Sequence, residues 1–236
     1  MSQVNKLFDY IQNRRKDGYS YRGTPVYDVS KSDIKKMKQI ADSYGFPFEW
    51  LANLINFESA GTFNPSIENS LGYVGLIQFG NSAASFLGVS KDELKRMNFS
   101  KQLDYVDRYI FEVLKNKNVI TDSSKTVGRN FTQTDLFMAI FYPAAVGKSN
   151  YVFPDSVQTA NNGIKTPLDY TARAVKETSP FPLNEVPVSI DEYVKKFGSV
   201  SSSFSAKGNN WWILPTAIII FGSLTALTVY YLQKNK

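Results

Sequence analysis

Glu58 is the residue of this sequence whose type and surroundings best fit acid–base chemistry. If residues 47–60 form a helix, one face of it consists of Leu51, Leu54, Ile55 and Glu58. A carboxylate on an otherwise apolar face is costly to ionise, and the negative end of the helix dipole adds to that cost in the last turn. Both effects raise the pKa of Glu58. A carboxylic acid that stays protonated near neutral pH is what a general acid for glycoside cleavage requires.

Two short motifs follow Glu58 along the chain. Gly61 and Pro65 end the predicted helix and begin a loop. Gly72 and Gly75 then precede an apolar run that contains Gln78. This spacing indicates a tight backbone next to a positioned amide side chain.

The order of these motifs resembles the soluble lytic transglycosylase family. The resemblance is carried by Glu58-Ser59, Asn64-Pro65 and Gly75-Leu76-Ile77-Gln78, where the family reads Glu-Ser, Asn-Pro and Gly-Leu-Met-Gln. Ile77 replaces the usual Met with little change in side-chain volume.

A later segment, residues 141–147, is similar to the family's third motif, Ala-Tyr-Asn-Ala-Gly. Tyr142 stands at the position of the Tyr that hydrogen-bonds the catalytic Glu in that family. Pro143 replaces the Asn, and one additional residue precedes Gly147. The resemblance implies that Tyr142 orients Glu58 at the substrate site.

The resemblance implies an all-α fold with a lysozyme-like catalytic domain and a groove beside Glu58. The substrate would be peptidoglycan, cleaved between N-acetylmuramic acid and N-acetylglucosamine. Glu58 would protonate the glycosidic oxygen and then accept the proton of the muramoyl C6 hydroxyl, which leaves a 1,6-anhydro end and consumes no water. One carboxylate would suffice where hydrolases usually need two. Ser59, Gln78 and Tyr142 are the expected substrate-binding residues.

Two alternatives remain open from the sequence. Glu68, in the loop between Pro65 and Gly72, could serve as the second carboxylate of a muramidase-type hydrolase. The domain could also be a wall-binding structural module without enzymatic activity. The combined presence of Glu58, Ser59 and Gln78 argues against such a module.

Composition limits the chemistry that is available. The chain of 236 residues contains neither Cys nor His, so disulfides, thiolate chemistry and His-dependent endolysin mechanisms are excluded, and zinc amidases are disfavoured. We expect no cofactor and no metal. A net charge of +6 suits an anionic partner such as a cell-wall polymer or lipid headgroups. No nucleic-acid-binding motif is present.

Helices predicted from apolar periodicity and capping signals would position the site. They cover residues 30–44, 81–87, 91–97, 101–115, 133–142 and 169–176. The last of these helices could form one wall of the substrate groove. We expect residues 1–29 to form an N-terminal arm packed on the main domain and residues 30–179 to form the catalytic domain.

The composition changes after residue 179. Residues 180–210 are rich in Pro and Ser and predict a tether, with a small helix over residues 190–197. Residues 211–232 form an uncharged run of 22 residues with Trp at one end and Tyr at the other. Its length and its aromatic ends predict a transmembrane helix, so a lipid membrane is an expected partner.

An anchor that follows the catalytic domain has a consequence for location. The start of the sequence lacks the apolar run of a secretory signal, so residues 1–208 should stay on the side of the membrane where they are made. Peptidoglycan lies on the other side. A bacteriophage enzyme that is carried in a virion membrane and cuts the wall during infection resolves this conflict, with other virion proteins as further candidate partners. A protein of the bacterial inner membrane, or one used at lysis, is the alternative.

Overall fold

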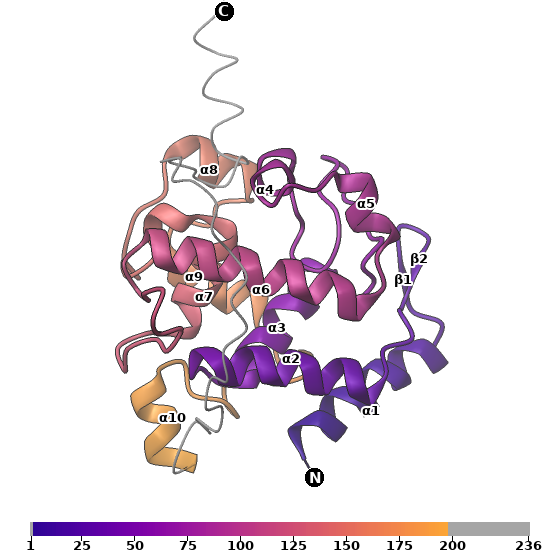
Figure 1. Cartoon of the computed structure of the whole chain (residues 1–236), viewed down its shortest axis with the longest axis horizontal. Coiled ribbons are helices and arrows are strands. Elements are labelled where there is room, and N and C mark those ends of the chain that lie inside the picture. The colour runs from indigo at the N-terminus through magenta and orange to yellow at the C-terminus, as the bar shows by residue number, and fades with distance from the viewer. Residues whose placement is uncertain (1, 198–236) are drawn as a thin grey trace, which may run out of the picture.

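A computed structural model describes residues 2–197 as a mostly helical fold (Figure 1). The predicted all-α class is confirmed at this level. The helices are α1 (Gln3–Lys16), α2 (Lys31–Tyr44), α3 (Phe48–Glu58), α4 (Asn81–Phe86), α5 (Lys91–Arg96), α6 (Phe99–Asn116), α7 (Gln133–Phe141), α8 (Asp155–Ala160), α9 (Pro167–Ala174) and α10 (Ile190–Phe197). A 3₁₀ turn, η1 (Pro143–Ala145), follows α7, and a small antiparallel hairpin joins β1 (Ser20–Tyr21) to β2 (Thr24–Pro25).

Capping boxes fix several helix starts where the sequence predicts them. Ser30 and Asp33 bond each other's backbone at the start of α2, and equivalent pairs begin α5 and α7. Each box satisfies backbone N–H groups that have no partner within the helix. Helix α8 lies in a region for which the sequence does not predict a helix.

Helix α3 is the centre of the molecule. Every residue from Phe48 to Ile55 is buried, so this helix is covered on all sides over its first two turns. Helices α2, α7 and α9 pack against it. A helix surrounded in this way has little freedom to shift, and it carries Glu58 at its last position.

The N-terminal arm packs on the main domain and shares its core. Leu7 and Ile11 of α1 are fully buried, and α1 packs on α2. The amphipathic spacing of these residues gives α1 an apolar face that needs a partner, and α2 supplies it.

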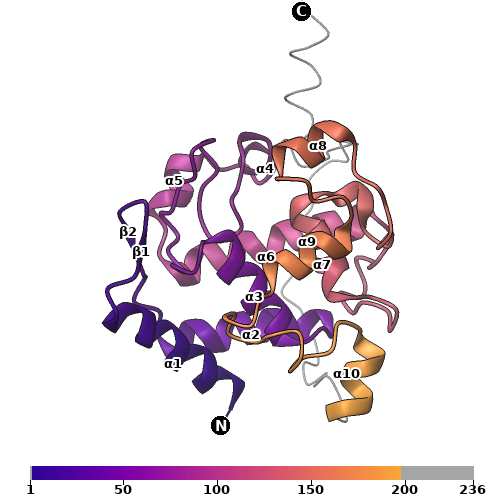
Figure 2. The same ribbon diagram turned by 180° about the vertical axis from the view of Figure 1, so that it is seen from behind.

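Over residues 180–197 the predicted tether differs from the structure. Residues 180–197, which we call the C-terminal strap, lie against the domain, and Phe181, Val186 and Ile190 are buried. Figure 2 shows the orange segment between α9 and α10 running across α3. The Pro residues of this segment suit both an extended path over a surface and a free linker. The burial of its apolar side chains favours the extended path over the surface.

Within residues 2–197, no helix is both long and apolar enough to cross a membrane. The predicted transmembrane helix at residues 211–232 and the second half of the predicted tether lie outside the described residues.

Candidate active site

Glu58 ends α3 with its side chain only partly exposed to solvent. The hydroxyl of Tyr170 donates a hydrogen bond of 2.8 Å to its Oε1. Burial raises the pKa of Glu58 to about 7, and the hydrogen bond from Tyr170 opposes this rise because it favours the charged form. At neutral pH the carboxyl group is therefore present in both protonation states, which suits a group that must first give and then take a proton.

Tyr170 is fixed by two aromatic neighbours. Its ring stacks on Phe141 of α7 with centroids 4.1 Å apart, and it meets Phe57 of α3 edge-on at 5.5 Å. Burial, together with the nearby Glu58 carboxylate, raises the pKa of Tyr170 well above its ordinary value. The phenol therefore stays protonated and acts as a donor to Glu58 at any physiological pH.

Tyr142 does not make the expected contact with Glu58. Helix α7 ends at Phe141, and the backbone of Tyr142 leaves the helical conformation before Pro143. Phe141 consequently faces Tyr170, whereas the ring of Tyr142 stacks on Tyr151 at 5.8 Å. Burial, followed by a hydrogen bond with Tyr151, raises the pKa of Tyr142 to about 12. Both tyrosines are partly exposed.

Ser59 lies in the core and not at the surface. Its hydroxyl donates to the carbonyl oxygen of Ile55 at 2.6 Å and accepts from the N–H of Phe63 at 3.0 Å. The side chain is fully buried. This placement does not fit the predicted substrate contact; it fits a role in ending α3 and turning the chain into the next loop.

Gln78 is partly exposed at the end of residues 72–78, which we call the glycine loop. Its Nε2 donates to the carbonyl oxygen of Gly75 at 3.1 Å. The backbone of Gln78 has a positive φ of 55°, a conformation that costs energy in a residue with a side chain. The tight backbone expected from the glycine spacing is thus present, and Gln78 remains a candidate for binding substrate.

Gln102 of α6 holds this loop from the inside. Its Oε1 accepts the N–H of Leu76 at 2.7 Å, and its Nε2 donates to the carbonyl oxygens of Pro65 and Leu94 at 2.9 and 2.8 Å. Gly75 has a φ of +80°, and a Cβ atom there would overlap the Gln102 amide. Gly75 therefore has two reasons to be glycine: its backbone angle and the amide packed against it.

Glu68 is an exposed residue held by a neighbouring cation. Its Oε2 lies 2.5 Å from Nζ of Lys95, and this hydrogen bond and charge lower the pKa of Glu68 below its ordinary value. Glu68 and Glu58 thus have opposite pKa shifts. Phe79, which directly follows the glycine loop, is buried and packs edge-on against Tyr109 at 6.2 Å.

Helix α1 and the turn that follows it contact the loop directly after Glu58. Nε of Arg14 donates to the carbonyl oxygen of Gly61 at 3.1 Å. The hydroxyl of Tyr19 donates to the carbonyl oxygen of Ala60 at 2.9 Å. The guanidinium of Arg14 also lies 3.7 Å from the centre of the Tyr19 ring. Both Ala60 and Gly61 have positive φ, which is costly for Ala60 and not for glycine, so these donors stabilise a turn that the backbone of Ala60 alone would disfavour.

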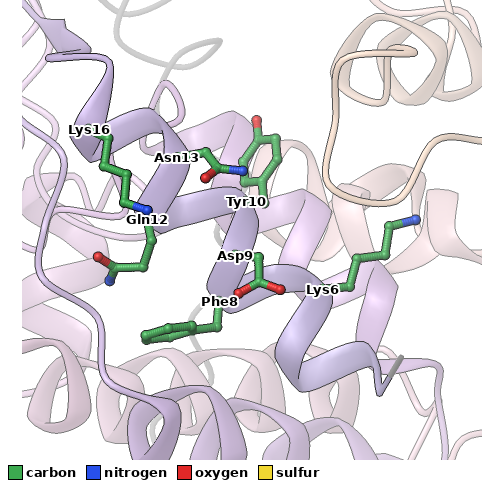
Figure 3. Close-up of a pocket in the computed structure, with 7 residues that line it drawn as sticks. All are labelled: Lys6, Phe8, Asp9, Tyr10, Gln12, Asn13 and Lys16. Carbon is green, nitrogen blue, oxygen red and sulfur yellow. The ribbon is translucent and has the colours of Figure 1, made fainter.

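A surface hollow of about 710 Å³ lies along α1 itself, and Figure 3 shows that its lining runs from Lys6 to Lys16 on that one helix. None of the predicted site residues lines it. In the described part of the chain, no group of three or more acidic side chains is placed to hold a metal ion.

Sequence reasoning missed two residues of this site. Tyr170 falls within the helix expected over residues 169–176, and that helix does face Glu58, yet no motif singles out the Tyr itself. Gln102 lies among the apolar residues of a strongly amphipathic helix. A polar side chain on such a face indicates a buried hydrogen-bonding role, and this pattern could have identified Gln102.

Comparison with known proteins adds no relative: no family model matches this chain, no curated protein matches its sequence, and no solved structure matches its fold.

Proposed function

We propose that this chain is a peptidoglycan lytic transglycosylase in which Glu58 is the single acid and base. The observation that carries the proposal is the hydrogen-bonded pair of Glu58 and Tyr170, in which burial raises the pKa of Glu58 to about 7. Glu58 is the last residue of α3, and its Glu-Ser motif is followed by Asn-Pro and Gly-Leu-Ile-Gln in the order of the family that the sequence resembles.

The reaction would proceed in two proton transfers. Protonated Glu58 donates its proton to the glycosidic oxygen while the bond from that oxygen to C1 of the muramoyl residue breaks. The resulting carboxylate is stabilised by the hydroxyl of Tyr170 and then accepts the proton of the C6 hydroxyl as O6 bonds to C1. One bond to C1 is broken and one is formed, and Glu58 ends in the protonation state in which it began.

The hydroxyl of Tyr170 supports this double role. A general acid that is only protonated would be a poor base in the second step. The hydrogen bond from Tyr170 favours the carboxylate, whereas burial favours the acid, so neither form is strongly excluded. Tyr170 thereby takes the part that the family resemblance assigned to Tyr142.

The paired state of Glu68 supports a transglycosylase over the muramidase alternative. A hydrolase of that type needs a second carboxylate that acts as a nucleophile or directs water at C1. The carboxylate of Glu68 is exposed and bonded to Lys95. It is therefore engaged in a surface ion pair instead of being free for catalysis.

Substrate contacts would come from partly exposed side chains. Gln78 and the stacked rings of Tyr142 and Tyr151 are the candidates, because stacked aromatic rings suit the apolar face of a sugar. Phe141 and Phe153 connect these rings to Tyr170. The basic net charge of +6 suits an anionic wall polymer.

The proposed place of action is a bacteriophage virion membrane, with the bacterial inner membrane as the alternative. It rests on the uncharged run at residues 211–232, which follows the catalytic domain in the sequence. Purified particles would be separated into membrane and capsid fractions and probed with an antibody to the chain. Detection in lysate of infected cells but not in particles would contradict the virion location and leave the chemistry open.

The reaction type is tested with the full chain in detergent, incubated with purified peptidoglycan in ¹⁸O-labelled water. Mass spectrometry of the released muropeptides should find 1,6-anhydro ends without labelled oxygen. Reducing ends that carry ¹⁸O would support the muramidase alternative. Binding to the wall without release of muropeptides would support the structural module.

A further inference from the structure

One face of α3 contacts the segment from α9 to α10 in reverse chain order. Along the helix, Phe57 meets Tyr170, Asn53 meets Phe181, Trp50 meets Pro187 and Glu49 meets Tyr193. The positions 49, 50, 53 and 57 share one side of a helix with 3.6 residues per turn. Residues 170–193 therefore run antiparallel to the helix that carries Glu58.

Asn53 makes the most specific of these contacts. Its Nδ2 donates to the carbonyl oxygen of Phe181 at 2.6 Å, and its Oδ1 accepts the N–H of Phe181 at 3.2 Å. Only 1% of Asn53 is exposed, and Phe181 is buried as well. A buried amide that bonds both backbone groups of one residue defines a single register, because a shift by one residue would leave four polar groups without partners.

The segment between Tyr170 and Phe181 is held by hydrogen bonds along most of its length. Helix α9 continues to Ala174, and the N–H of Val175 bonds the carbonyl oxygen of Thr171. A closed turn follows. The N–H of Lys176 donates to Oγ of Ser179 at 3.0 Å, and the N–H of Ser179 donates to the carbonyl oxygen of Lys176 at 3.0 Å. The position of Phe181 on α3 is thus transmitted to α9.

We propose that Asn53 is a positioning residue: by holding the backbone of Phe181, it sets the register of α9 on α3 and thereby the hydrogen bond from Tyr170 to Glu58. The inference rests on the proposed function only in taking Glu58 as the group whose chemistry matters. The contact of Asn53 and the contact of Tyr170 lie on the same helix, so a change at one end of the segment reaches the other without crossing the rest of the core.

The test measures the pKa of Glu58 directly in the full chain in detergent micelles. Glutamate labelled with ¹³C at the side-chain carboxyl gives one signal per Glu, and Glu58→Gln identifies the signal of interest. In Asn53→Ser, where water can replace the lost amide, the pKa of Glu58 should rise above that of the wild type, as it should in Tyr170→Phe. The double variant should give the value of Tyr170→Phe alone, since Asn53 acts through Tyr170.

Trp50→Phe is the matched control. It removes the 3.0 Å bond from the indole Nε1 to the carbonyl oxygen of Pro187, on the same helix face and the same strap. We expect it to lower the melting temperature, as Asn53→Ser does, but to leave the pKa of Glu58 unchanged. A general loosening of the strap would move the pKa in both variants and would overturn the specific role of Asn53.

Asn53→Asp provides a second variant if Asn53→Ser does not fold, because its carboxyl group keeps an acceptor for the N–H of Phe181. Its Glu58 pKa should lie between those of the wild type and Tyr170→Phe.

A folded Asn53 variant with the wild-type pKa of Glu58, or additive shifts in the double variant, would overturn the inference. If the expected pKa pattern appears in a chain that releases no muropeptides, the inference stands and the proposed function fails. Anhydro products from a chain whose Glu58 pKa does not respond to the Asn53 variants would overturn the inference and support the proposed function.

Discussion

The hydroxyl of Tyr170 reaches the carboxylate of Glu58 across 112 positions of sequence, from α9 to the last residue of α3. Two opposing influences meet at this contact. Burial favours the protonated acid, and the phenol donor favours the carboxylate, with burial the stronger of the two. The balance leaves the pKa of Glu58 at about 7.

Replacing Glu58 tests its catalytic role. Glu58→Gln keeps the shape of the side chain and an acceptor for Tyr170 but removes the transferable proton. We expect lytic activity on purified walls to fall by roughly 10²–10⁴-fold, the usual contribution of a general acid or base. The far-ultraviolet circular dichroism spectrum should be unchanged. A folded variant with nearly wild-type lysis would remove Glu58 from the mechanism.

The rate should depend on pH with a descending limb near neutrality. Glu58 must be protonated to begin the reaction, so kcat/KM should fall as the pH rises through about 7. In Tyr170→Phe the limb should move to higher pH, because the lost donor no longer favours the carboxylate. A hydrogen bond to a charged group contributes about 1.5–3 kcal/mol, so turnover should also fall by roughly tenfold or more. A limb that stays in place would contradict the assigned contact.

The same raised pKa predicts how stability depends on pH. Glu58 titrates near 7 in the fold and near 4.5 when unfolded, so the folded state binds its proton more tightly. The resulting stabilisation is complete below pH 4.5 and is lost as the pH rises through 7. Glu58→Gln should therefore be more stable than the wild type at pH 8, by at most about 3 kcal/mol, and equal to it near pH 4. Urea unfolding of both proteins at the two pH values measures this difference.

Glu68 separates the two reaction types. Glu68→Gln removes a surface ion pair with Lys95 and should change the lytic rate by less than about twofold. Its products should still be anhydro ends. An inactive but folded Glu68→Gln, together with solvent oxygen in the products, would move the assignment to a hydrolase.

The glycine loop gives a test of positioning without touching Glu58. Gly75→Ala forces a Cβ into the Gln102 amide at a φ of +80°, whereas Gly88→Ala meets no atom within 4 Å at a φ of +68°. Both should lose about 1–3 kcal/mol from the backbone angle, and Gly75→Ala should lose more. Lytic activity should fall in Gly75→Ala alone. Equal effects of the two variants on activity would contradict a role for the loop in holding Gln78.

Local signals in the sequence predict most helices of this fold but only part of the site. The pairs Ser30/Asp33 and Ser90/Glu93 are capping boxes in the structure because the interaction needs only four consecutive residues. The partner of Glu58 depends on where α7 stops, and a one-residue difference puts Phe141 instead of Tyr142 against Tyr170. The local pattern of the strap predicts a tether because Pro180, Pro182 and Pro187 dominate it, while its role depends on contacts with α3 more than 100 residues away.

The antiparallel path of the strap has a consequence for how the protein folds during its synthesis on the ribosome. Asn53 emerges 128 residues before Phe181, which at 5–20 residues per second is a delay of about 6–26 s. During this interval Asn53 lacks the backbone groups that its amide bonds in the fold, and Glu58 lacks the donor from Tyr170. The nascent chain consequently acquires its acid–base pair only after almost all of the described residues have been synthesised. Under the proposed function, lytic activity would appear late in translation, at the same time as the last part of the core closes.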